Sequence, residues 1–130
     1  MIALDTNVLV RYLARDNAVQ TAQALRLIES RSASSPAFIS LVVLVELVWV
    51  LERSYRIPKP TVARYLHLLM TGDGVVIEHQ ELAHEALSAF ENQGADFADA
   101  VITTLARSAS CTTTYTFDRK AARLPGFTLL

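Results

Sequence analysis

Two carboxylates stand three residues apart at the start of an apolar run, in the segment GADFADAVI (94–102). Asp96 and Asp99 would share one end of a helix, where each raises the free-energy cost of ionising the other. Asp96 as an N-cap with Asp99 in the first turn would be ordinary helix chemistry. Alternatively, both acids belong to a larger group of carboxylates that binds a cation.

Two further acids follow predicted strands. Asp5 ends the apolar run MIAL, and Asp118 follows TTTYTF (112–117). Ligands of parallel sheets bind beyond the carboxyl ends of the strands, so these acids could converge with Asp96 and Asp99. Taken singly, Asp5 could be a turn or cap residue, and Asp118 could lie in a solvated turn.

Glu46 is the only polar residue in LVVLVELVWVL (41–51). A helix that is apolar on every side is normally buried, and burying a lone carboxylate costs several kcal/mol unless it is paired or protonated. Its neighbours three and four residues away are apolar, so we expect a buried Glu46 that finds a cation on another element. A protonated or interface-paired acid is the alternative.

A hard divalent cation would satisfy all of these acids. Mg²⁺ and Mn²⁺ prefer oxygen ligands, and either ion would remove the repulsion within the group Asp5, Glu46, Asp99 and Asp118. A metal-bound water has a lowered pKa and can attack a phosphodiester. The sequence leaves open whether one ion or two are bound, and whether Asp96 is a ligand or a cap.

Strands and helices alternate in the pattern of the chain, which predicts an α/β protein with a mainly parallel sheet. Caps are predicted at Thr6 or Asn7, at Asn17 and at Ser40, and Gly94 is predicted to end a helix. The expected strands are 1–4, 37–40, 74–78, 112–117 and 127–130, and the expected helices are 6–15, 17–30, 41–55, 61–70, 80–93 and 96–110.

Length, charge and cysteine content exclude several kinds of protein and of binding site. The 130 residues suit a single domain (1–130), and a net charge of −1 argues against binding nucleic acid by bulk charge alone. One cysteine, Cys111, excludes an internal disulfide and a thiolate metal site. The longest strongly apolar run, 41–51, is too short to span a bilayer, and no signal peptide is visible, so we expect a cytoplasmic protein without a membrane contact.

Four segments in order resemble PIN-domain ribonucleases, specifically the VapC-type toxins of bacterial type II toxin–antitoxin systems. The matching segments are ALDTNVLVRYL, ISLVVLVELVWVL, GADFADAVI and TYTFDRKAARLPG. The resemblance implies a three-layer α/β/α sandwich and an endoribonuclease dependent on Mg²⁺ or Mn²⁺. It also implies an RNA substrate (transfer or ribosomal RNA), a VapB-type antitoxin that inhibits the enzyme, and a homodimer.

The resemblance assigns roles to individual residues. Asp5, Glu46, Asp99 and Asp118 match the catalytic and metal-binding acids, and Asp96 matches an additional acid of many members. Asn7 and Thr116 match polar residues that support the pocket. From their positions beside Asp118 and after Asp5, Arg119, Lys120 and Arg11 are candidates for RNA contacts. The aromatic residues Phe97, Tyr115 and Phe117 are expected in the core rather than as stacking platforms for bases.

Three other functions compete with this interpretation. A haloacid dehalogenase-like phosphohydrolase also ends its first strand with Asp, but it requires a second Asp two residues later, where this chain has Asn7. A phospho-accepting receiver domain would need adjacent acids after the first strand and a lysine after a late one, and neither is evident. A catalytically silent PIN-like interaction module is the remaining alternative, and the intact acids argue against it.

Overall fold

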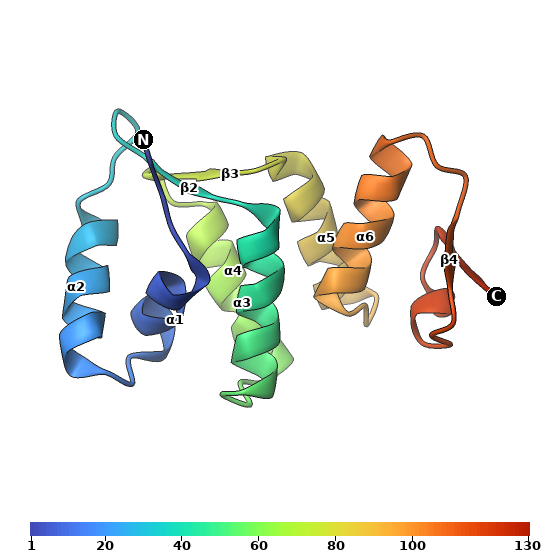
Figure 1. The fold of residues 1–130 in the computed structure, drawn as a ribbon, viewed down its shortest axis with the longest axis horizontal. Helices are drawn as coiled ribbons and strands as arrows, with labels where there is room; N and C mark the ends of the chain where they lie inside the picture. The colour runs from blue at the N-terminus through green and yellow to red at the C-terminus, as the bar shows by residue number, and fades with distance from the viewer. The chain divides into compact units, whose positions relative to one another are not determined.

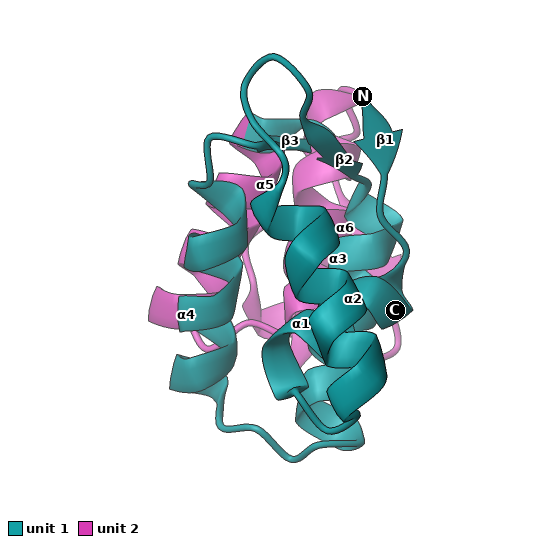
Figure 2. Cartoon of the chain, turned by 90° about the vertical axis from the view of Figure 1, so that its left-hand side faces the viewer, with its two compact units in different colours: residues 1–80 teal, residues 81–130 magenta.

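Helices and strands alternate along the chain in the predicted order (Figure 1). The computed structural model describes residues 1–130, which form two compact units, residues 1–80 and residues 81–130 (Figure 2). The strands are β1 (Ile2–Ala3), β2 (Ala37–Ile39), β3 (Val75–Ile77), β4 (Thr114–Thr116) and β5 (Phe127–Leu129). The helices are α1 (Thr6–Ala14), α2 (Ala18–Glu29), α3 (Leu41–Arg53), α4 (Lys59–Met70), α5 (Gln80–Asn92) and α6 (Phe97–Ser108), with a short 3₁₀ turn, η1 (Ala121–Arg123).

The unit formed by residues 1–80 is built on a three-stranded sheet in the order β1-β2-β3. Both strand pairs are parallel, with Phe38 opposite Ala3 on one side and opposite Val76 on the other. Helix α1 packs against α2 and α3, and α4 packs against α3 and β3. The α/β class and the parallel pairing predicted from the sequence are therefore confirmed.

Two predicted caps of this unit are confirmed. The Asn17 side chain accepts a hydrogen bond from the backbone N–H of Gln20 at 3.0 Å, at the start of α2. The Ser40 hydroxyl accepts from the N–H of Val43 at 3.3 Å, at the start of α3. Each bond satisfies one of the free N–H groups in the first turn of its helix.

The predicted cap of α1 is wrong. The N-cap position is occupied by Asp5 rather than by Thr6 or Asn7, and Thr6 is already the first residue of the helix. Thr6 is buried, so its hydroxyl lies inside the unit rather than at a free helix end.

The predicted burial of Glu46 is also wrong. Glu46 is exposed on α3, in a stripe with Val42 and Trp49, which are 73% and 59% exposed. These residues recur at the spacing of one helix face, and the opposite face carries the buried leucines 44, 47 and 51. Glu46 has apolar neighbours along the sequence, but those residues do not enclose its side chain in the folded structure.

The unit formed by residues 81–130 contains the parallel pair β4 and β5 beside α5, α6 and η1. Phe90 of α5 and Phe97 of α6 are both buried and meet edge to face, with ring centroids 5.9 Å apart. Gly94 follows α5 with φ at 66°, the left-handed conformation that glycine adopts without strain, so its predicted role at the end of this helix is confirmed.

No helix of the chain combines the length and the apolar character needed to cross a membrane.

Candidate metal and catalytic site

Asp5 offers a free carboxylate at the carboxyl edge of the first sheet. It lies two residues beyond β1, and its backbone has the extended conformation of an N-cap (φ −84°, ψ 159°). Its side chain nevertheless makes no capping hydrogen bond, and it is exposed. Asp5 thus occupies the position of a cap while leaving both carboxylate oxygens available to another partner.

Asp96 is the N-cap of α6. Its Oδ1 accepts hydrogen bonds from the N–H groups of Ala98 at 3.0 Å and of Asp99 at 3.4 Å. The capping role that the sequence left open is therefore confirmed. Both bonds use the same oxygen, so the cap does not consume Oδ2.

Asp118 orders the turn that follows β4. Its Oδ1 accepts from the N–H groups of Lys120 at 2.8 Å and Ala121 at 3.2 Å, and its own N–H donates to Oγ1 of Thr116 at 3.0 Å. Thr116 therefore helps to fix the backbone of the acid, and its predicted role in supporting the pocket stays a prediction. The solvated turn was one of the two interpretations of Asp118, and its exposed carboxylate does lie in such a turn.

In the unit formed by residues 81–130, the charges of Asp96, Asp118 and Lys120 act on Asp99. Partial burial raises the pKa of Asp99 above its ordinary value of 3.8, and the charges of Asp96 and Asp118 raise it further, while Lys120 lowers it. A carboxylate in the first turn of a helix is ordinarily stabilised by the helix dipole. The net upward shift means that burial and repulsion outweigh that contribution, so Asp99 gains from any added positive charge.

The donor chemistry fits a hard divalent cation. Within neither unit do three or more His, Cys, Asp or Glu side chains lie close enough together to hold one ion. The acids are nevertheless all oxygen donors, Asp5 is uncommitted, and Asp99 is destabilised by two neighbouring carboxylates. A Mg²⁺ or Mn²⁺ ion beside Asp99 would reverse that repulsion.

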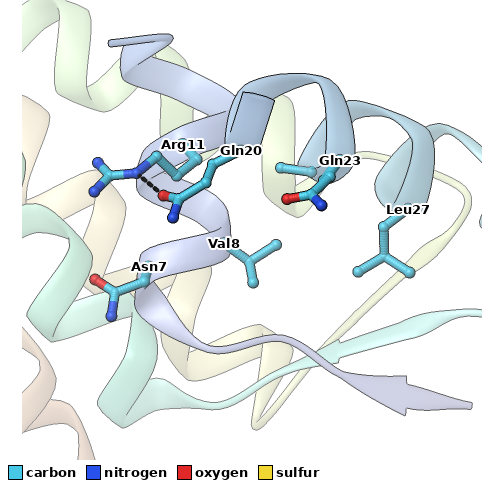
Figure 3. A pocket seen from close by; sticks show the side chains of 7 residues that line it. Asn7, Val8, Arg11, Gln20, Gln23 and Leu27 are labelled. Atoms are coloured by element: carbon cyan, nitrogen blue, oxygen red, sulfur yellow. Dashed lines mark hydrogen bonds between the residues drawn. The ribbon is translucent and has the colours of Figure 1, made fainter. Parts of the chain in front are cut away.

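Two other predicted residues line a groove between α1 and α2. Asn7 and Arg11 form part of its wall, with Val8, Gln20, Gln23, Ala24 and Leu27, around a volume of about 300 Å³ (Figure 3). The Arg11 guanidinium donates to Gln20 Oε1 at 2.6 Å and to Asp16 at 3.1 Å. Arg11 is therefore engaged within its own unit, and its predicted contact with RNA stays a prediction.

The sequence analysis did not identify Tyr55, which forms hydrogen bonds with both Arg11 and Asp16. Tyr55, just beyond α3, accepts from Arg11 at 3.1 Å and donates to Asp16 at 2.7 Å. That donated bond, assisted by the positive charge of Arg11, lowers the pKa of Asp16. The contact spans 39 positions, so no local pattern reveals it.

Glu78 was missed as well. It follows β3 at the same sheet edge, and its Oε2 accepts from the N–H of Leu41, the first residue of α3, at 2.9 Å. An acid directly after a strand was the signal that identified Asp5, and the same signal marks Glu78.

The expected burial of the aromatic residues holds for only one of them. Phe97 is buried, but Tyr115 and Phe117 are 66% and 80% exposed. Tyr115 lies in β4 and Phe117 directly follows it, and β4 pairs on one side only, with β5, so side chains here are not enclosed as in the interior of a wide sheet. Arg119 and Lys120 are exposed beyond Phe117.

A family model for the PIN domain matches residues 2–126, nearly the whole chain. The chain belongs to the PIN domain family. PIN domains are nucleases.

Among solved structures, this PIN domain resembles the crystal structure of VapC20 (Rv2549c) from Mycobacterium tuberculosis, a toxin that cleaves the sarcin–ricin loop. The two chains are 20% identical, with a TM-score of 0.47, and the match covers 95% of this chain and 94% of the other. No curated protein matches the chain.

Proposed function

We propose that this PIN domain protein is an endoribonuclease of the VapC toxin type that depends on Mg²⁺ or Mn²⁺. The observation that carries the proposal is the group of acids around the start of α6, where partial burial and then the charges of Asp96 and Asp118 raise the pKa of Asp99. The order of the four VapC-like segments supports the specific class. We assign catalysis and metal binding to Asp5, Glu46, Asp99 and Asp118.

Each of these acids contributes a different property. Asp5 has no hydrogen-bond commitment at its helix end, and Asp118 is held in place by Thr116 and its own turn. A cation beside Asp99 would favour its charged form, which partial burial and the charges of Asp96 and Asp118 disfavour. When bound, a divalent ion supplies positive charge for the phosphate and a water of lowered pKa.

Basic side chains beside Asp118 suit the phosphates of the substrate. Arg119 and Lys120 are both exposed, and Lys120 already acts electrostatically on Asp99. Contacts to phosphates position a nucleic acid without reading its sequence. These two residues are therefore assigned to holding the RNA backbone.

The proposed VapC-type class also implies a substrate, an inhibitor and an oligomeric state. We expect a transfer or ribosomal RNA substrate, a VapB-type antitoxin that blocks the acids, and a homodimer in the cytoplasm. Nothing in the acid chemistry itself selects one RNA over another.

Cleavage of total RNA by the purified chain tests the proposal. Activity is expected with Mg²⁺ or Mn²⁺ and is expected to disappear with EDTA, with cleavage sites mapped by sequencing the new ends. Asp99→Asn should abolish activity. Asp73→Asn, at an exposed acid in the turn between α4 and β3, is the matched control and should leave activity intact.

The competing functions predict different results. A folded chain that cleaves no RNA with any divalent metal would overturn the proposal in favour of the silent interaction module. Hydrolysis of p-nitrophenyl phosphate without RNA cleavage would instead support the phosphohydrolase.

A further inference from the structure

Two side chains accept hydrogen bonds from the N–H groups at the start of α3, and one of them comes from the end of the sheet. Ser40 at the N-cap accepts from Val43, and Glu78 accepts from Leu41 at 2.9 Å across the end of the sheet. Glu78 is half-buried, and its own N–H donates to the carbonyl of Ile39 at 3.0 Å. The carboxylate thus bonds the helix while its backbone bonds the strand that leads into that helix.

This arrangement is stronger than an ordinary cap. Hydrogen bonds from N–H groups to a carboxylate are shorter and stronger than those between neutral groups, and a negative charge is stabilised at a helix N-terminus. The bond joins residues 37 positions apart, so it ties the first turn of α3 to β3 rather than to its own loop. The orientation of α3 is therefore set by the sheet.

Glu46 lies on the helix that is held in this way. It is five residues after Leu41, about 7.5 Å along the helix axis at 1.5 Å per residue. Glu46 is exposed and lies on the open face of α3. Its position consequently depends on how the first turn of the helix is fixed.

We propose that Glu78 is a positioning residue for Glu46, acting through its hydrogen bond to the first turn of α3. This inference rests on the proposed metal-dependent nuclease function. Glu78 itself touches neither the metal nor the RNA in this proposal.

The test compares Glu78→Ala with Glu78→Gln, which keeps an oxygen acceptor for the Leu41 N–H. Amide hydrogen exchange should accelerate at Leu41 in the alanine variant and return toward the wild-type rate in the glutamine variant. The concentration of Mn²⁺ that gives half of the thermal stabilisation should rise in Glu78→Ala and return toward the wild-type value in Glu78→Gln. RNA cleavage at limiting Mn²⁺ should fall in parallel.

Asn17→Ala is the matched control, because it removes the cap of α2 in the same unit. It should lower thermal stability without changing the Mn²⁺ dependence. In a Glu46→Gln background, Glu78→Ala should cause no further loss of metal binding, because Glu78 affects the metal only through the position of Glu46.

Each failure has its own signature. If wild type binds Mn²⁺ and cleaves RNA while Glu78→Ala leaves exchange and metal dependence unchanged, the positioning role is overturned and the nuclease function stands. An equal change in Asn17→Ala would overturn it too, since loss of stability would then explain the effect. If wild type cleaves no RNA, the proposed function fails, and unchanged exchange at Leu41 in Glu78→Ala would independently overturn the positioning role.

Discussion

At the scale of single residues, the acids of the chain differ in what already holds them. Asp96 and Asp118 each use one oxygen to order backbone N–H groups, whereas the Asp5 side chain makes no capping bond. Asp99 is half-buried and repelled by two of its neighbours. The free-energy cost of neutralising the carboxylate therefore differs from one acid to the next, although all four are aspartates.

Asp99→Asn should stabilise the metal-free protein at neutral pH. Because the folded-state pKa of Asp99 is raised, the stability associated with its protonated form is complete below 3.8 and is lost as the pH rises through the raised value. Asparagine stays neutral throughout. Thermal melts should show the variant above wild type at pH 7, with the difference shrinking as the pH falls toward 3.8.

Addition of Mn²⁺ should invert this order, because the ion binds the wild-type carboxylate and stabilises the folded state by mass action. A variant that melts below wild type at pH 7 without metal would contradict the electrostatic account.

Substitutions of Asp96 separate its two roles. Asparagine is an equally good N-cap, so Asp96→Asn should leave the melting temperature unchanged, whereas Asp96→Ala should lose about 1 kcal/mol. We expect Asp96→Asn to retain RNA cleavage within about tenfold of wild type, as an outer partner would. Cleavage as low as in Asp99→Asn would show instead that Asp96 is a metal ligand.

At the scale of elements, most of the strands and helices follow from local patterns. The caps at Asn17 and Ser40 were predictable because a cap bonds amides two or three residues away. The exposed stripe of α3 was not, since an apolar run gives no information about which face has a neighbour to pack against. Glu78 was marked by its place directly after a strand, but its bond to Leu41 was not predictable, nor was the bond of Tyr55 to Asp16, because the partners are 37 and 39 positions apart.

The turn into β5 carries the clearest local constraint. Gly126 has φ at 92°, and a Cβ at this position would collide with Oγ1 of Thr103 on α6. Gly126→Ala should therefore cost about 1–3 kcal/mol of unfolding free energy, measured by urea denaturation. Gly72→Ala is the control, because its Cβ would lie at an ordinary 3.6 Å from Val75 and the variant should be nearly neutral. Equal costs at both positions would contradict the steric argument.

At the scale of the whole molecule, the PIN family match spans residues 2–126 and thus parts of both units. The acids assigned to catalysis are divided between the units, with Asp5 and Glu46 in residues 1–80 and Asp99 and Asp118 in residues 81–130. The family resemblance assigns these acids to one site because its four segments span the chain, and that assignment stays a prediction. Composition and periodicity alone could not make that assignment, because they describe one segment at a time. The prediction of a single domain over 1–130 stays a prediction.

Metal binding should depend on acids from both ranges. Mn²⁺ should raise the melting temperature of wild type, and both Asp5→Asn and Asp99→Asn should abolish that rise. Glu81→Gln, at an exposed acid in α5, is the control and should keep it. A full metal-induced rise in Asp5→Asn would remove Asp5 from the set of ligands.

The uncapped start of α1 has a consequence for protein engineering. Asp5 stands where a serine or threonine would bond the free amides of the helix, and its own side chain makes no such bond. Asp5→Ser could gain that bond and so raise the resistance of the protein to heat, while discarding a carboxylate assigned to catalysis. A selection for thermostable variants would then enrich changes at position 5, and a selection for nuclease activity would remove them.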